Sequence, residues 1–422
     1  MFMEKFLIYG GEKLFGNIKV DCAKNAYLPI MAASVMTEDE VVLKSMPNIL
    51  DIQNMRKILE FLGAETKFDG SDLHIFCKSI NNNTIPNNLS KNLRSSVFML
   101  GPLLARFKKA KVSYPGGCNI GLRPIDLHLK GLKELGAKVV ENHGSIFCDG
   151  SKMKSGTVIL DYPSVGATEN LMMASIFLPG VTKIYNSAKE PEIVDLQNFL
   201  NSMGAIVCGA GSDEITITGV QKLFGTTYKP IPDRIVAGTL LIACAMCGGK
   251  ITLENVVPEH FLSLTDKLQK SGCKIIVSSD KITIESKGKL KSVEMVETLP
   301  YPGFPTDLQS QILAMQTISK GVCVVRENLF ETRFRFAQEL IKMGADIKLC
   351  GQTAFVCGVK ELMGAEVFAS DLRGGAALVL AGLCAKGHTT VHGVHHIDRG
   401  YSSFEKVLSA LGAKITRESE NL

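Results

Sequence analysis

A stretch over residues 114–128 carries side chains that could act as an acid, a base or a nucleophile. Cys118 lies inside it, Arg123 follows, and the polar pair Asp126 and His128 comes next. The glycines and prolines of its first half disfavour a regular helix or strand, so we expect a loop. A loop thiol beside a fixed cation could deliver a proton or a nucleophile to an anionic substrate. The stretch alone also fits a surface turn with an ordinary free cysteine.

The composition indicates a globular protein with more than one domain. Of the 422 residues, 45% are hydrophobic and 21% are charged, so two or three cores are expected. The net charge of +5 is spread without basic blocks or stacking aromatics, which favours a small anionic ligand over nucleic acid. The 12 cysteines are scattered and no secretory signal is visible, so we expect reduced thiols and a cytoplasmic location. The apolar run from Ile235 to Cys247 is too short to span a bilayer.

A sixfold internal repeat organises the chain. The motif Leu-x-x-Leu-Gly-Ala, or a close variant, recurs with 73, 68, 68, 72 and 68 residues between its glycines. In each copy a helical apolar pattern ends at this glycine, which can take the left-handed conformation that closes a helix. An alternating strand pattern follows, and then a second strand and a long apolar helix. The marker glycines are Gly63, Gly136, Gly204, Gly272, Gly344 and Gly412.

Each long apolar helix is expected to begin at a short polar turn. A helix N-terminus is often capped by a side-chain oxygen, a role that Ser164, Asp307 and Asp371 could fill. A cation at the same position is unfavourable by about 0.3–1 kcal/mol, so several cations there indicate that something negative is bound. The cations at the expected helix starts are Lys24, Arg94, Arg234 and Arg373.

The two ends of the chain indicate how the repeats close into domains. The last marker glycine lies ten residues from the C-terminus, so the sixth copy lacks room for its second strand and helix. The surplus strand over residues 14–20 is therefore expected to complete the C-terminal half. This arrangement predicts two three-repeat domains, residues 23–230 and residues 1–22 with 231–422. Two chain crossings would join them as a double hinge that can close on a ligand.

Nine motifs occur along the chain in the following order: CAKNAYLP, LRSSVFMLGPLLAR, PGGCNIGLRPIDLH, PSVGAT, EPEIVD, PDRI, FPTD, DLRGGAALVLAG and HIDRGY. In sequence and in order, they resemble the motifs of the UDP-N-acetylglucosamine enolpyruvyl transferases. The resemblance implies an α/β fold of two inside-out, barrel-like domains, each made of three βαβαββ repeats. It implies transfer of the enolpyruvyl group of phosphoenolpyruvate to the 3′-hydroxyl of UDP-N-acetylglucosamine, with release of phosphate through a tetrahedral intermediate. This reaction is the first committed step of peptidoglycan synthesis and needs no cofactor.

The resemblance also implies roles for individual residues. Cys118 matches the general acid that protonates phosphoenolpyruvate, and Asp307 matches the group that accepts the proton of the sugar hydroxyl. The implied catalytic set is Cys118, Asp307, Lys24 and Arg399. The residues implied for phosphoenolpyruvate are Lys24, Asn25, Arg123, Arg333, Arg373 and Arg399. The residues implied for UDP-N-acetylglucosamine are Arg94, Arg123, Pro124, Ile125, Asp126, Leu127, Ser164, Val165, Gly166, Asp307 and Leu329.

One position departs from the family pattern, and several alternatives stay open. Tyr162 stands where many members have a lysine that contacts the diphosphate, and a phenol brings no charge. Transfer to shikimate 3-phosphate, as in a sister family, and a weakly active second copy are the alternative functions. We expect a monomer. No metal site is expected, because the adjacent His395 and His396 do not share a face of a strand. Glu190 and Asp195 could form a catalytic carboxylate pair or cap a helix start.

Overall fold

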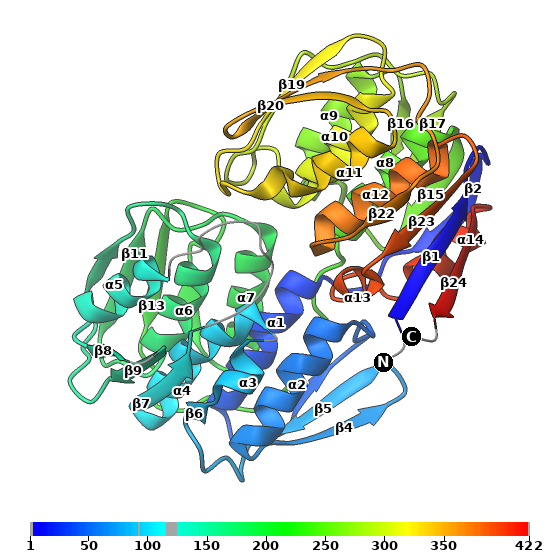
Figure 1. The fold of residues 1–422 in the computed structure, drawn as a ribbon. Helices are drawn as coiled ribbons and strands as arrows, with labels where there is room; N and C mark the ends of the chain where they lie inside the picture. The colour runs from blue at the N-terminus through cyan, green and yellow to red at the C-terminus, as the bar shows by residue number, and fades with distance from the viewer. Residues whose placement is uncertain (1–2, 92, 115–124, 143, 421–422) are drawn as a thin grey trace. The chain divides into compact units, whose positions relative to one another are not determined.

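The computed structural model describes residues 3–91, 93–114, 125–142 and 144–420. These residues divide into two compact units. Unit 1 contains the described residues up to 21 and from 232 onwards, and unit 2 contains those between 22 and 231. Both units combine helices with four-stranded sheets (Figure 1).

Three helices form the centre of unit 1. Helix α8, Arg234–Cys247, has 12 of its 14 residues buried, and α10, Gln309–Thr317, is buried along its whole length. Helix α12, Leu372–Cys384, is almost as completely buried and contacts both of them. A helix that is buried on every side needs cover from all directions, and the sheets of the unit provide it.

Unit 2 has the same plan. Its central helices are α1, Lys24–Ala33, α4, Leu100–Phe107, and α6, Val165–Ser175. A 3-10 helix, η2, Arg94–Met99, leads directly into α4 and contacts α1 and α6. The helix predicted to start near Arg94 begins instead with this tighter turn. Such 3-10 turns are frequent at helix N-termini, and the sequence alone does not distinguish them from the first turn of an α-helix.

Six four-stranded sheets, three in each unit, are present among the described residues. Each sheet has one parallel strand pair followed by two antiparallel neighbours. The sheets of unit 2 are β14 (Thr226–Tyr228), β3 (Val41–Leu43), β5 (Asp72–Phe76) and β4 (Glu65–Asp69); β6 (Thr84–Ile85), β7 (Lys109–Ser113), β9 (Ser145–Asp149) and β8 (Lys138–Asn142); and β10 (Thr157–Ile159), β11 (Val181–Tyr185), β13 (Glu214–Thr218) and β12 (Ile206–Cys208).

The sheets of unit 1 repeat this order with strands from both ends of the chain. They are β2 (Leu14–Lys19), β15 (Gly249–Glu254), β17 (Lys281–Ser286) and β16 (Lys274–Val277); β18 (Met295–Glu297), β19 (Val322–Arg326), β21 (Thr353–Cys357) and β20 (Asp346–Cys350); and β22 (Glu366–Phe368), β23 (His388–His392), β1 (Met3–Tyr9) and β24 (Lys414–Glu420).

An amphipathic outer helix precedes each marker glycine. All six of these glycines have φ between 92° and 106°, the left-handed region that residues with a side chain rarely adopt. A strand follows each of them, so the predicted helix–glycine–strand unit is confirmed. The outer helices are α2 (Leu50–Leu62), α5 (Asp126–Glu134), α7 (Pro191–Ser202), α9 (Leu262–Lys270), α11 (Ala337–Lys342) and α14 (Phe404–Ala410).

Strand pairing closes each unit on itself. In unit 1, β2 pairs in parallel with β15, and β1 pairs antiparallel with the C-terminal strand β24. The strand predicted over residues 14–20 thus belongs to the C-terminal half, as expected from the surplus at the N-terminus. In unit 2 the last strand, β14, returns to pair with β3 of the first repeat. Each unit is therefore a ring of three repeats.

Several short helical turns complete the regular structure of the described residues. Within the described ranges, no helix combines the length and apolar character needed to cross a lipid bilayer. The short turns are α3 (Asn87–Ser90), α13 (Val394–Ile397), η1 (Ser34–Met36), η3 (Pro258–Phe261), η4 (Thr306–Leu308) and η5 (Arg333–Phe336).

Candidate active site

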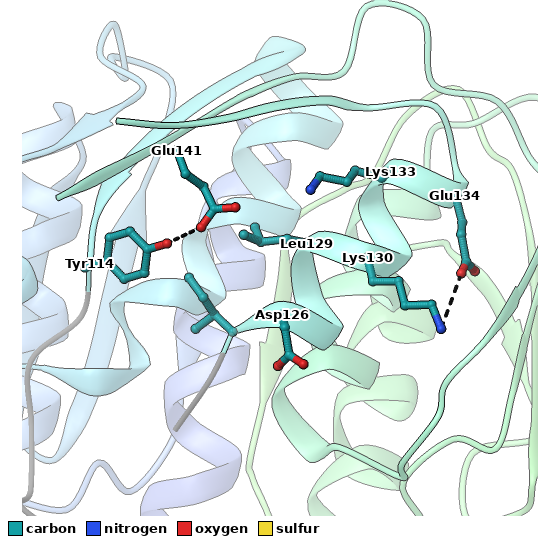
Figure 2. A pocket seen from close by; sticks show the side chains of 8 residues that line it. Tyr114, Asp126, Leu129, Lys130, Lys133, Glu134 and Glu141 are labelled. Carbon is teal, nitrogen blue, oxygen red and sulfur yellow. Dashed lines mark hydrogen bonds and ion pairs between the residues drawn. The ribbon is translucent and has the colours of Figure 1, made fainter. Parts of the chain in front are cut away.

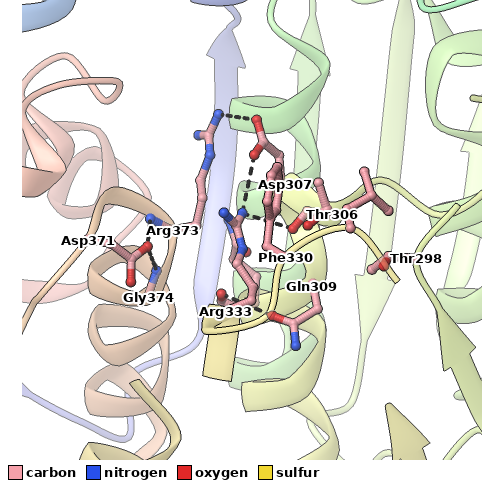
Figure 3. A network of polar contacts seen from close by, with 12 residues as sticks. Thr298, Thr306, Asp307, Gln309, Phe330, Arg333, Asp371, Arg373 and Gly374 are labelled. Atoms are coloured by element: carbon pink, nitrogen blue, oxygen red, sulfur yellow. Dashed lines mark hydrogen bonds and ion pairs between the residues drawn. The ribbon is translucent and has the colours of Figure 1, made fainter. Parts of the chain in front are cut away.

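A carboxylate held by two arginines forms the centre of the candidate site in unit 1 (Figure 3). Asp307 lies in η4, and its Oδ2 accepts a hydrogen bond of 2.8 Å from Nη2 of Arg373, in the first turn of α12. Its Oδ1 accepts one of 3.2 Å from Nη2 of Arg333, the first residue of η5. The same Arg333 nitrogen donates to the carbonyl oxygen of Thr306 at 2.9 Å. Three separate segments therefore bring two guanidinium groups onto one carboxylate.

Both guanidinium groups are almost completely buried. The side chains of Arg333 and Arg373 are 2% and 4% exposed, whereas that of Asp307 is 27% exposed. Burial lowers the pKa of Arg373, but electrostatic interactions with Asp307, Tyr401 and Asp233 raise it by more, so this guanidinium stays ionised. The two arginines carry one more charge than the carboxylate they share, and the buried Nε of Arg333 has no acceptor within the described part of the chain. A small anion could balance the excess positive charge and also accept a hydrogen bond from this Nε.

The expected cap at Asp307 is not formed, whereas the one at Asp371 is. Neither η4 nor α10 has a side-chain cap, because their N-cap residues are Pro305 and Leu308, while Asp307 lies inside η4 and turns toward the arginines. Asp371 Oδ1 accepts the backbone N–H groups of Arg373 and Gly374, both at 3.0 Å. A Cβ on Gly374 would lie 2.6 Å from Asp371 Oδ2 and 2.8 Å from Phe336 Cβ. The turn that orients Arg373 therefore requires glycine.

Arg399, also predicted for this site, follows a firmly anchored residue of unit 1. The carboxylate of Asp398 accepts two hydrogen bonds from Arg417 of β24, at 3.0 and 2.6 Å. Arg417 also donates to Glu405 at 3.1 Å, and these hydrogen bonds raise its pKa despite partial burial. Burial lowers the pKa of His396, and the nearby His395 and Arg399 lower it further. Arg399 therefore lies close to His396. The backbone before Arg399 is thus fixed by a two-point ion pair.

Lys24 of unit 2 is also paired with a carboxylate of the chain. It is the first residue of α1, where the preceding Ala23 offers no side-chain cap. Its Nζ lies 3.2 Å from Oδ2 of the buried Asp51. Asn25 follows in the same turn and is half-buried. The sequence indicated a negative partner for the cations at helix starts. At Lys24, and also at Arg373, this partner is an aspartate of the protein itself.

A second group of predicted residues surrounds His128 in unit 2. Nδ1 of the buried His128 accepts a hydrogen bond of 2.7 Å from Nδ2 of Asn170. Burial, with a contribution from Arg94, lowers the pKa of His128 to about 3, so its imidazole is neutral at pH 7. This fits an orienting or ligand-contacting group better than a base. A Cβ on Gly166 would lie 2.9 Å from His128 Cε1 and 3.1 Å from Phe98 Cε1, so α6 can approach only because this residue lacks a side chain.

Asn170 belongs to this candidate group, and sequence reasoning missed it. Its Nδ2 also donates to the carbonyl oxygen of Val97 at 3.0 Å, and its Oδ1 accepts the backbone N–H of Gly101 at 2.7 Å. The fully buried amide thereby joins α6 to the η2–α4 segment that begins at Arg94. An asparagine within the apolar helix TENLMMAS was the signal that could have revealed it, because a buried amide needs partners.

A pocket of about 670 Å³ opens beside Ile125 and Asp126 in unit 2 (Figure 2). Tyr114 donates a hydrogen bond to Glu141, which raises the pKa of the phenol. The lining has more carboxylates than ammonium groups, so the pocket does not favour a diphosphate. The lining residues are Tyr114, Ile125, Asp126, Leu129, Lys130, Lys133, Glu134 and Glu141.

The remaining predicted contacts differ in how they are placed. Ser164 caps α6 through a hydrogen bond of 3.4 Å from the backbone N–H of Ala167, which confirms its capping role. Leu127 and Val165 are half-buried in the first turns of α5 and α6. The side chain of Tyr162 is largely exposed, and its carbonyl oxygen accepts the Ser164 N–H at 2.7 Å. Three predicted residues lie outside the described residues: Cys118, Arg123 and Pro124.

Two of the other sequence interpretations were wrong in their structural premise. His395 and His396 lie in the helical turn α13 rather than in a strand, with ring centroids 4.1 Å apart. Asp195 does not cap a helix start, since it lies inside α7 and its Oδ1 accepts a hydrogen bond of 2.6 Å from Tyr228 Oη. Burial raises the pKa of Asp195 to about 6. Glu190 immediately precedes α7 but forms no side-chain cap.

Two rings of three βαβαββ repeats place the chain among the enolpyruvyl transferases, a class that the comparisons with known proteins support. The family model described as EPSP synthase (3-phosphoshikimate 1-carboxyvinyltransferase) matches residues 8–408, and the chain belongs to this family. It is 50% identical over 415 residues to UDP-N-acetylglucosamine 1-carboxyvinyltransferase 2 of Caldanaerobacter subterraneus subsp. tengcongensis, covering 98% of this chain and 100% of that one. UDP-N-acetylglucosamine 1-carboxyvinyltransferase 1 of the same organism is 48% identical over 414 residues, covering 98% and 99%.

Solved structures share the fold. The enolpyruvyl transferase NikO from Streptomyces tendae matches with a TM-score of 0.89 and 22% identity over 100% of both chains. EPSP synthase from Acinetobacter baumannii matches with a TM-score of 0.73 and 18% identity, covering 98% of this chain and 100% of that one. The predicted fold class is therefore confirmed.

Proposed function

We propose that this protein transfers the enolpyruvyl group of phosphoenolpyruvate to the 3′-hydroxyl of UDP-N-acetylglucosamine and releases phosphate. The observation that carries the proposal is identity of 48–50% to relatives named for this reaction over almost their whole length. Identity to the solved EPSP synthase is only 18%. The protein would thus perform the first committed step of peptidoglycan synthesis. We expect it to act in the cytoplasm as a monomer, without a cofactor or a metal.

The reaction needs one proton donor, one proton acceptor and cations for two anionic groups. In the addition step, a proton reaches C3 of phosphoenolpyruvate while the sugar oxygen bonds to C2 and gives up its proton. In the elimination step, C3 loses a proton and the C2–phosphate bond breaks. We assign the sugar proton to Asp307, whose carboxylate is oriented by two donors and remains partly exposed. We assign the proton for C3 to Cys118 on the strength of the motif alone.

The cations would hold the carboxylate and the phosphate of phosphoenolpyruvate. Arg333 and Arg373 suit this role because together they exceed the charge of Asp307, and a planar guanidinium can pair with two oxygens at once. Lys24, with Asn25, and Arg399 complete the proposed set among the described residues. Arg123 is added from the motif.

The sugar nucleotide is proposed to bind along residues 125–127, the capped start of α6 and Leu329. The N-terminus of α6 offers backbone N–H groups and partial positive charge near Arg94, which suits a diphosphate. The close packing of Gly166 on His128 fixes this helix start. Tyr162 brings no positive charge, so we expect the diphosphate to depend more strongly on Arg94 than in members with lysine there.

The test is phosphate release from phosphoenolpyruvate measured with each candidate acceptor. We expect release with UDP-N-acetylglucosamine and none with shikimate 3-phosphate. The opposite pattern would refute the proposal in favour of the sister activity. A kcat below about 1 s⁻¹ with the correct acceptor would favour a weakly active second copy, because typical enzymes turn over at about 1–1,000 s⁻¹. Fosfomycin should alkylate Cys118, and Cys118→Asp should abolish that alkylation, as read by intact-protein mass.

A further inference from the structure

Glu327 is a buried carboxyl group that the proposed chemistry does not use. It directly follows β19, and its side chain is 0% exposed. Within the described ranges its partners are uncharged: the hydroxyls of two threonines and the backbone N–H groups of two residues. Burying a carboxyl group is costly unless its oxygens are well hydrogen-bonded, and four donors satisfy that need. A side chain with this many fixed partners constrains the geometry of everything it touches.

The two oxygens of Glu327 hold two different segments. Oε2 accepts a hydrogen bond of 2.9 Å from Oγ1 of Thr306. Oε1 accepts the backbone N–H groups of Leu329 and Phe330 at 2.9 and 3.2 Å, and Oγ1 of Thr298 at 3.0 Å. One carboxyl group thus ties the η4 segment to the turn that follows β19.

Both segments carry residues of the candidate site. Thr306 directly precedes Asp307, and its carbonyl oxygen accepts the 2.9 Å hydrogen bond from Arg333. The Phe330 ring lies 5.7 Å from the Cζ of Arg333 and provides an aromatic face for that guanidinium. Movement at Glu327 would therefore displace Asp307, the proposed proton acceptor, and Arg333, one of the cations that orient it.

We infer that Glu327 is a positioning residue for the transfer reaction. Its Oε2 sets the direction of the Asp307 carboxylate through Thr306, and its Oε1 holds the Leu329 turn, where the sugar nucleotide is proposed to bind. The inference rests on the proposed function. It predicts two separate effects. The hydrogen bond between Glu327 and Thr306, called the first arm, controls turnover. The hydrogen bonds between Glu327 and the turn at Leu329, called the second arm, control affinity for UDP-N-acetylglucosamine.

The experiment compares the steady-state kinetics of two variants with those of a matched control. Thr306→Val removes only the first arm and should lower kcat about tenfold while leaving KM for UDP-N-acetylglucosamine near the wild-type value. Glu327→Gln leaves one accepting oxygen for both arms, so it should lower kcat and also raise this KM by about tenfold or more. Thr317→Val removes a buried threonine hydroxyl of the same unit, bonded to Ala314 O at 2.7 Å, and should change neither constant.

Thermal unfolding of all three variants separates positioning from stability. Equal kinetic constants for Glu327→Gln, Thr306→Val and Thr317→Val would overturn the inference, even if all three unfold at lower temperature. A KM change in Thr306→Val as large as that in Glu327→Gln would overturn the division into two arms. A wild-type enzyme that releases no phosphate with UDP-N-acetylglucosamine would instead overturn the proposed function, and the inference with it.

Discussion

Replacement of Asp307 by asparagine removes the charge from the centre of the site while keeping its shape. Each carboxylate oxygen accepts from a different arginine, at 2.8 Å from Arg373 and at 3.2 Å from Arg333. Whichever way the asparagine amide is turned, its NH₂ group faces a guanidinium, so one hydrogen bond is lost and two donors oppose each other. The substitution therefore tests a proton acceptor and an ion pair together, and two measurements are needed to separate them.

The expected loss of stability follows from the burial of the two arginines. Breaking a buried ion pair by removing one partner costs about 3–5 kcal/mol, because a charge remains without compensation. The arginines are 2% and 4% exposed but the aspartate is 27% exposed, so water screens part of the pair. We therefore expect a loss of about 2–4 kcal/mol, which lowers the Tm of a domain of this size by roughly 5–15 °C.

The expected loss of activity follows from the missing base. An amide cannot take the sugar proton, and general-base catalysis contributes about 10²–10⁴-fold to the rate. Phosphate release at saturating concentrations of both substrates, below the unfolding temperature of the variant, measures this loss as a lower kcat. Asp195→Asn serves as the control, because Asp195 is a buried carboxyl group of unit 2 that hydrogen-bonds Tyr228 and has no proposed role in the reaction. An Asp307→Asn enzyme that keeps more than about a tenth of the wild-type kcat would refute Asp307 as the proton acceptor.

Three further substitutions probe the elements around the site. Gly166→Ala should raise the KM for UDP-N-acetylglucosamine, because the new methyl group meets His128 at 2.9 Å, whereas Gly156→Ala enters open space and should not. Below pH 6.5 the His128 side chain binds a proton in the unfolded chain but not in the folded protein, where its pKa is about 3. The unfolding free energy of the wild type should therefore fall by up to about 1.4 kcal/mol per pH unit as the pH is lowered. Denaturant titrations should find a smaller slope in His128→Gln. Arg417→Ala frees the carboxylate that precedes Arg399 and should raise the KM for phosphoenolpyruvate, with Arg417→Lys intermediate, while an unchanged KM would show that Arg399 needs no such anchor.

The repeat units could be predicted from sequence because their signals are local. A helical apolar pattern, a glycine in the left-handed region and an alternating strand all lie within a short window, and Gly63, with φ of 106°, shows how directly the glycine reports its conformation. The surplus strand at the N-terminus also indicated which half it completes. Which strands pair could not be predicted in detail, because the pairing of Leu14 with Gly249 depends on how distant repeats close into a ring.

The cations of the site could be predicted, but their partners could not. Lys24 and Arg373 stood out as unfavourable charges at helix starts, which is a local property. Their carboxylate partners lie 27 and 66 residues away in the chain, so no spacing rule links them. Glu327 remained hidden for a related reason, because its hydrogen bonds to Thr298 and Thr306 span 29 and 21 residues of the chain. The sequence placed Asp307 equally well at a helix cap, and only its position between two arginines excludes that role.

The two carboxylate–cation groups differ in charge balance, and that difference bears on substrate choice. Lys24 and Asp51 carry opposite charges 3.2 Å apart, so this pair presents little net charge. Asp307 is shared by Arg333 and Arg373, so these three side chains together carry one net positive charge, and the charge of Asp233 acts on Arg373 from outside this group. A buried excess charge disfavours a neutral or cationic ligand and favours an anion that supplies the missing hydrogen-bond acceptors. Under the proposed function, the arginine pair would therefore favour a carboxylate or a phosphate, and Asp307 would accept the proton of the sugar hydroxyl group.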